Sequence, residues 1–283
     1  MNLDGIRALV GSLPWAEAAR NWITTRQSQQ AAVRAGARPV LAALAQQHAT
    51  RPLLILCADR DRAHRFYEEL CSWSPDAANV LFYPELDYLP YENLPHFSST
   101  LSARISVLGA LLAGQSANRP VGSHPVIVTS VRALLERVPS PAELGEHVLM
   151  LAPGQRTDPA ALKNRLIRFG YEPMPQVEDP GTFTGRGGIV DIFPPSEDQP
   201  IRIEFFGDEI ESVRPFNVST QRSTAQHTAL SILPANEVPT WRSGDFAAEV
   251  RGLDSGGLRP EVREQWQRHL RLLEEGVYFE HAS

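Results

Sequence analysis

The chain has 283 residues, 42% of them hydrophobic and 21% charged, which is ordinary for a globular protein that buries a sizeable core. Its length favours two domains, or one domain with an insertion. The formal net charge of −6 argues against a dominant non-specific nucleic-acid surface, although a local basic face is compatible with it.

The chain has no run of eighteen apolar residues and no signal-peptide pattern in residues 1–13, which predicts a cytoplasmic protein. Its two cysteines, Cys57 and Cys71, form no C-x-x-C pair and lie in apolar or helical settings. They are therefore predicted to be reduced residues of the core.

The first half of the chain alternates short apolar runs with amphipathic stretches. After a helical region over 1–50, apolar runs predict three strands, at 52–57, 80–83 and 125–129. Run 52–57 has the continuous apolar character of a strand buried on both faces. Helices are expected after Asp59, over 101–112 after Ser98, Ser99 and Thr100, and over 131–137. This alternation predicts an open α/β domain with a parallel sheet over 1–143.

The pattern changes at about residue 144. A strand at 148–151 precedes a helix that begins at Thr157-Asp158-Pro159 and ends at Gly170. Residues 176–233 then carry short strands and turns. We therefore expect a smaller α+β domain with an antiparallel sheet over 144–236. The tail, 237–283, is expected to hold a flexible patch at 255–257 and a helix over 260–275.

The motifs of common catalytic sites are absent from the sequence. A P-loop needs the lysine of G-x-x-x-x-G-K-[ST] to meet the β and γ phosphates, but Lys163 is the one lysine among 27 basic residues and lies inside an amphipathic helix. There is no H-E-x-x-H, no zinc-type Cys/His cluster and no G-x-S-x-G. We therefore expect no enzyme activity, no cofactor and no metal in this chain.

The sequence Ile201–Phe206 predicts a strand with one buried and one functional face. Alternation places Arg202, Glu204 and Phe206 opposite the apolar residues. An arginine and an aromatic on one outward face are residue types enriched in binding hot spots. The alternative is that Phe206 lies under a loop or at a strand end and that Arg202 merely pairs with Glu204.

A second arginine belongs to the neighbouring predicted strand. Strict alternation along 187–193 would place Arg186 on the buried side, so a β-bulge at Gly187 and Gly188 is needed to turn it outward. Arg186 would then lie near Arg202 across an antiparallel pair. Because opposed like charges are unfavourable, these two arginines need either mutual separation or an acidic partner, which an acidic patch on another protein would supply.

The segment 87–97 is rich in aromatic residues and proline. Aromatic side chains in a loop can stack on bases, but Glu85, Asp87 and Glu92 would repel phosphates. A packed loop at the sheet edge is the favoured interpretation, and a DNA-binding fragment is the alternative function.

The blocks 183–194 and 201–211 together resemble the second domain of the nucleotide excision repair protein UvrB and the matching domain of the bacterial transcription-repair coupling factor. UvrB has an intact P-loop and a long aromatic hairpin after the early strands. Here the P-loop is missing and Leu89-Pro90-Tyr91-Glu92 leads directly to the helix at Leu101, which is similar to the coupling factor.

The resemblance covers roughly residues 20–283 and implies an N-terminal UvrB-like module of that family. It implies a degenerate, RecA-like helicase sheet domain, interrupted by the second domain and rejoined by the tail. It also implies that the second domain binds UvrA through Arg186, Arg202 and Phe206, with Glu204 beside them. RNA polymerase, DNA and ATP-driven translocation would belong to other domains of the full-length protein.

Overall fold

The computed structural model describes residues 4–13, 16–17, 21, 30–86, 99–114, 123–223, 226–235, 237, 243–253, 256–257 and 259–274. They form two compact units. One consists of described residues in Met1–Leu86 and Val107–Arg137, and the other of those in Asp87–Ser106 and Val138–Ser283. The predicted domain bounds, 1–143, 144–236 and 237–283, and the return of the tail to the first domain stay predictions.

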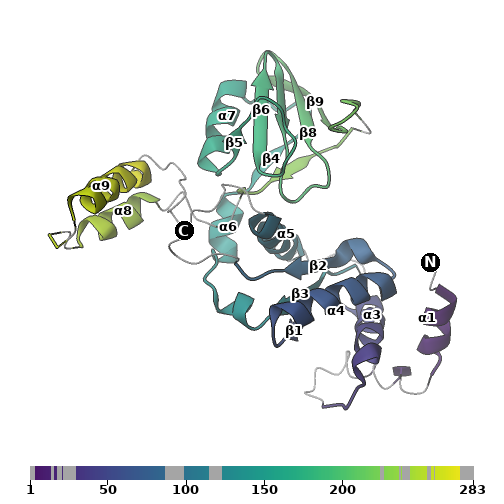
Figure 1. The fold of residues 1–283 in the computed structure, drawn as a ribbon. Helices are drawn as coiled ribbons and strands as arrows, with labels where there is room; N and C mark the ends of the chain where they lie inside the picture. Colours follow the sequence, from purple (N-terminus) through teal and green to yellow (C-terminus); the bar gives the residue numbers. More distant parts are fainter. Residues whose placement is uncertain are drawn as a thin grey trace. The chain divides into compact units, whose positions relative to one another are not determined.

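The first unit holds a three-stranded parallel sheet in the order β1-β3-β2 (Figure 1). Its strands are β1 (Leu53–Cys57), β2 (Val80–Tyr83) and β3 (Val126–Ser130). The helices described in or entering this unit are α1 (Asp4–Gly11), α3 (Arg38–His48), α4 (Arg60–Trp73) and α5 (Ser99–Gly114). The parallel sheet predicted from the alternating pattern is confirmed.

Helices α3 and α4 pack on one face of this sheet, around a cluster that includes Ala43, Leu70 and Val128. Asp59 caps α4 as predicted, because its carboxylate accepts a hydrogen bond from the Arg62 N–H at 2.9 Å. Cys57 and Cys71 are free thiols, partly buried against this cluster.

Two expectations for the first unit are wrong. Strand β1 is not buried on both faces, because Leu54 and Leu56 are 56% and 52% exposed; β1 lies at the sheet edge, and β3 is the strand buried along its whole length. The helix expected over 131–137 is a 3₁₀ turn, Arg132–Leu135. The apolar residues of this segment favoured a helix in the sequence, but Leu134 and Leu135 are exposed and do not form a buried helix face.

The second unit is built on a five-stranded sheet in the order β5-β6-β7-β8-β9. Its strands are β5 (Glu172–Pro173), β6 (Thr182–Arg186), β7 (Ile189–Ile192), β8 (Ile201–Phe206) and β9 (Glu209–Pro215). Strands β6 to β9 are antiparallel neighbours, and β5 runs parallel to β6. A second pair joins β4 (Leu149–Leu151) to β10 (Leu230–Ile232). The antiparallel sheet expected here is confirmed.

One hydrophobic core fills the space between the sheet and α7 (Pro159–Arg168). Leu162 and Leu166 of α7 are fully buried in it. The Asp158 carboxylate caps α7 by accepting hydrogen bonds from Ala160 N and Ala161 N at 3.1 and 3.2 Å. Gly170 follows the helix with φ +81°, as the C-terminal signal in the sequence predicts. The helix therefore begins and ends where its caps require.

Three further helices belong to the second unit: α6 (Pro141–Glu146), α8 (Ser243–Arg251) and α9 (Pro260–Glu274). Helices α8 and α9 pack on each other, with Ala247 and Leu273 buried between them. The buried Arg104 of α5 forms an ion pair with Glu237 at 2.5 Å. Of the helices in the described ranges, none is both long and apolar enough to cross a membrane.

Candidate protein-docking site

The outward face of β6, β7 and β8 brings the predicted site residues together. In the sheet register Thr184 lies opposite Asp191, and Asp191 lies opposite Arg202. Their neighbours Val190 and Ile203 are buried on the core side. Since directly opposed residues share a face, Asp191 and Arg202 both point away from the core.

Arg186 reaches this face through a tight turn, and not through the β-bulge that the sequence suggested. Arg186 lies opposite Ile189, so Gly187 and Gly188 form a two-residue hairpin turn, with φ +58° at Gly187. Positive φ at the first central glycine is typical of a type II′ turn. Because the turn has two residues, Arg186 lies on the same face of the sheet as Ile189 and Asp191, and on the opposite face from Val190.

The bulge in this sheet lies elsewhere. The β8–β9 register shifts between Glu204 and Phe205. Gly188 is nevertheless constrained, because a Cβ there would lie 2.8 Å from the Phe205 carbonyl oxygen. The Phe205 N–H donates to the Gly188 carbonyl at 2.7 Å, so the hairpin tip is hydrogen-bonded directly onto β8.

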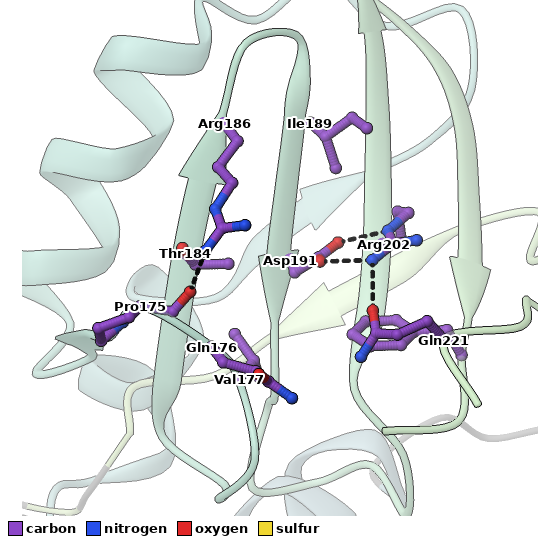
Figure 2. Close-up of a pocket in the computed structure, with 10 residues that line it drawn as sticks. Pro175, Gln176, Val177, Thr184, Arg186, Ile189, Asp191, Arg202 and Gln221 are labelled. Carbon is purple, nitrogen blue, oxygen red and sulfur yellow. Dashed lines mark hydrogen bonds and ion pairs between the residues drawn. The ribbon is translucent and has the colours of Figure 1, made fainter. Parts of the chain in front are cut away.

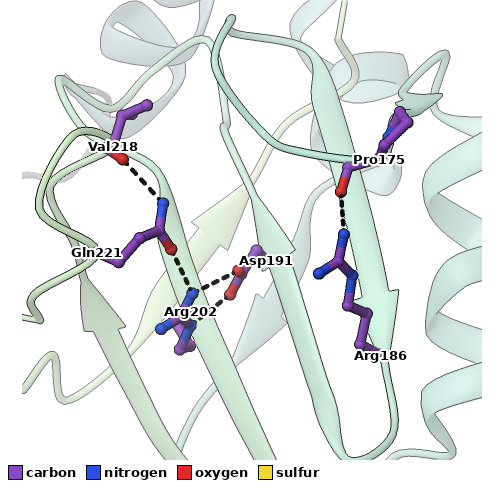
Figure 3. Close-up of polar contacts among 6 residues, drawn as sticks. All are labelled: Pro175, Arg186, Asp191, Arg202, Val218 and Gln221. Atoms are coloured by element: carbon purple, nitrogen blue, oxygen red, sulfur yellow. Dashed lines mark hydrogen bonds and ion pairs between the residues drawn. The ribbon is translucent and has the colours of Figure 1, made fainter.

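Arg202 is held by a carboxylate from the neighbouring strand. Its Nε donates to Asp191 Oδ1 at 2.8 Å and its Nη2 donates to Oδ2 at 2.7 Å (Figure 3). This bidentate pair is the main cause that raises the pKa of Arg202. The alternative in which Arg202 pairs with Glu204 is therefore wrong. Glu204 instead accepts a hydrogen bond from Ser212 Oγ at 2.5 Å.

Two other residues complete the surroundings of the Arg202 guanidinium. The carbon of that group lies 4.6 Å from the ring centroid of Phe216, within the range of a cation–π contact. Gln221 Oε1 accepts a hydrogen bond from Arg202 Nη2 at 3.1 Å (Figure 3). Arg202 thus has a carboxylate, an amide and an aromatic ring as fixed neighbours.

Arg186 and Phe206 present less constrained groups. Arg186 Nη2 donates to the Pro175 carbonyl at 2.7 Å (Figure 2). Phe206 is 81% exposed, so it does not lie under a loop of the described chain. Aromatic residues are among the types enriched in binding hot spots.

Arg186, Asp191 and Arg202 line one cleft of about 390 Å³ (Figure 2). The other lining residues come from β6, β7 and the two loops beside the sheet: Pro175, Gln176, Val177, Thr184, Ile189, Phe216 and Gln221. Two guanidinium groups face one carboxylate here, which leaves an excess positive charge. Such a cleft can receive an acidic or carbonyl-rich protein segment, with guanidinium groups as the donors.

The sequence interpretation missed Asp191, Phe216 and Gln221. Asp191 could have been identified from the sequence, because it is a single carboxylate inside the apolar run 189–193. Such a group needs a partner if the strand is half-buried. Nothing in the sequence pointed to Phe216 and Gln221, since only the tertiary structure brings them into contact with Arg202. The expected aromatic loop at 87–97 lies outside the described residues. The partner-binding role of Arg186, Arg202, Phe206 and Glu204 stays a prediction.

Residues 149–238, which include the whole sheet and the cleft, match the model of the UvrB interaction domain. Relatives are similar to this chain over a longer stretch than these residues. The transcription-repair-coupling factor of Escherichia coli (strain K12) is 31% identical over 201 residues, covering 71% of this chain and 17% of the relative.

The coupling factor of Myxococcus xanthus is 35% identical over 192 residues, or 66% of this chain and 15% of the relative. The UvrABC system protein B of Streptococcus agalactiae is 29% identical over 194 residues, or 67% and 29%. The predicted resemblance to the coupling factors is confirmed. This chain spans less than a fifth of the coupling factors that it matches.

Proposed function

We propose that the UvrB interaction domain of this chain binds UvrA, and that the chain serves transcription-coupled nucleotide excision repair as part of a coupling factor. The family match over residues 149–238 and the coupling-factor relatives support this proposal. The observation that carries it is geometric: Arg186 and Arg202 line one cleft on a sheet face, and Phe206 stands exposed at the end of the strand that bears Arg202.

In this proposal the chain recruits UvrA and catalyses nothing itself. The first unit would be a degenerate helicase-like sheet domain, since the sequence offers no P-loop lysine. Contacts with RNA polymerase and DNA would be made by parts of the full-length protein that lie beyond this chain.

Alanine substitution of Arg186 and Phe206 tests the proposal. Both side chains are outside the core, so their removal should reduce UvrA capture in a pull-down without altering the circular dichroism spectrum. A hot-spot side chain contributes about 2 kcal/mol or more to binding, which is roughly a 30-fold loss of affinity for each.

The matched control is Arg156→Ala, because Arg156 is exposed and does not line the cleft. It should capture UvrA as the wild type does. Undiminished capture by the Arg186→Ala/Phe206→Ala double variant would refute the proposal.

A further inference from the structure

The loop 217–222 forms one side of the environment of Arg202. A bridge between Phe216 and Ser223 closes it, and Asn217 N–H donates to the Arg222 carbonyl at 3.0 Å. Gln221 N–H also donates to the Asn217 carbonyl, at 2.8 Å. The loop is therefore an ordered hairpin end whose shape is set by its own backbone.

Gln221 has an unusual backbone conformation. Among the described residues it is the one non-glycine residue with a positive φ, at +55°. A side chain with Cβ is disfavoured in this region, and such conformations concentrate at functional sites because neighbouring contacts hold them. Glycine would meet the backbone requirement more easily, so the glutamine side chain needs another reason to be there.

The side-chain amide supplies that reason. Gln221 Nε2 donates to the Val218 carbonyl at 2.9 Å, while Oε1 accepts from Arg202 Nη2 (Figure 3). The opposite orientation of the amide would set its donor against the guanidinium and its acceptor against a carbonyl. The two bonds therefore fix the amide, and the amide fixes one edge of the guanidinium.

We infer that Gln221 is a positioning residue for partner binding, acting through Arg202. In the described part of the chain, the Arg202 hydrogen bonds use Nε and both N–H groups of Nη2. The two N–H groups of Nη1 are left for a carboxylate or carbonyl of the partner. Asp191 and Gln221 hold the guanidinium plane over Phe216, so the partner meets donors whose rotamer is already set. Preorganisation of this kind raises affinity by reducing the ordering cost of binding.

This inference rests on the proposed function, and Gln221→Gly in the intact chain tests it with purified UvrA as the probe. Glycine keeps the loop backbone but removes the amide. We expect UvrA affinity, measured by titration, to fall roughly three- to tenfold, as for the loss of one hydrogen bond. The melting temperature should not fall, because glycine relieves the positive φ. The control is Gln226→Gly, an exposed glutamine that does not line the cleft and whose loss should leave affinity unchanged.

A double-mutant cycle with Arg202→Lys separates positioning from direct contact. Lysine keeps the charge but lacks the planar fork by which Arg202 contacts Asp191 and Gln221 at once, so Gln221→Gly should cost little in that background. An equal loss in both backgrounds would mean that Gln221 touches the partner directly, and it overturns the inference.

Full affinity in the Gln221→Gly single variant also overturns the inference but leaves the proposed function intact, provided that Arg186→Ala weakens binding. Absence of UvrA binding by the wild-type chain overturns both.

Discussion

Arg202 shows why a residue can lie on a docking face and still belong to the fold. Its side chain is 20% exposed and that of Asp191 is 12% exposed, so both charges are largely removed from water. The bidentate geometry compensates for this loss of hydration. Replacing Arg202 alone would leave the Asp191 carboxylate without its charge partner. If an Arg202 variant binds less well, its stability must therefore be measured as well, so that a loss of folding is not taken for a loss of binding.

Asp191→Asn should lower the free energy of unfolding by about 1–3 kcal/mol, because it leaves a half-buried guanidinium without its counter-charge. Urea denaturation of the two proteins at neutral pH measures this. Asp208→Asn is the matched control: its pair with Arg156 is exposed and should contribute less than about 1 kcal/mol. Equal stability of the two variants would contradict the structural role assigned to Asp191.

At the scale of elements, the β6–β7 hairpin decides which residues face the partner. Its two-residue turn puts Arg186 on the same face of the sheet as Asp191 and Arg202, and the tip hydrogen-bonds to β8 at Phe205. A turn one residue longer or shorter would move Arg186 to the core side, since side chains alternate along a strand. The position of Arg186 therefore depends on the glycines at the turn.

Gly188→Ala should destabilise the chain by about 1–3 kcal/mol, because the new Cβ would meet the Phe205 carbonyl at 2.8 Å and force the backbone to move. Urea denaturation checks the stability, and UvrA titration checks the docking face.

Gly185→Ala provides the comparison in the same hairpin. There the nearest atom is Lys163 Cδ, which belongs to a flexible side chain that can swing away. This variant should be close to neutral. A Gly188→Ala protein as stable as Gly185→Ala would show that the tip is not tightly packed on β8.

At the scale of the molecule, the docking domain has its own core. The core cluster of the second unit runs from Leu149 to Ala235 in sequence and draws on no residue of the first unit. A hydrophobic core contained in one stretch of chain is what allows a domain to fold alone.

A fragment of residues 138–237 should therefore fold cooperatively and bind UvrA with an affinity close to that of the whole chain. One sigmoidal urea transition, seen equally by fluorescence and circular dichroism, would establish two-state folding. The intact chain is the control. A fragment that is soluble but unfolded would mean that the core requires α5 or the tail, for example through the Arg104–Glu237 ion pair.

Much of the fold follows from local signals in the sequence. Asp59 and Asp158 mark helix starts, Gly170 marks a helix end, and alternation along Ile201–Phe206 separates the core face from the docking face. These signals are readable because caps and strand periodicity involve residues close together in the chain. The missing P-loop lysine is equally a property of the sequence alone.

The tertiary structure alone decided which groups surround the docking residues. Glu204 is two positions from Arg202 on the same strand, whereas Asp191 is directly opposite on β7. Opposed cross-strand residues lie closer than alternate residues of one strand, so Asp191 forms the pair. Likewise, Leu54 and Leu56 are exposed because β1 lies at the edge of its sheet. The hydrogen bond between Gln221 and Arg202 also depends on the tertiary structure, because the two residues are far apart in the sequence. Alternation in the sequence determined the outward face of Ile201–Phe206, whereas strand pairing and the β6–β7 turn determined the side on which Arg186 lies and the partners of Arg202.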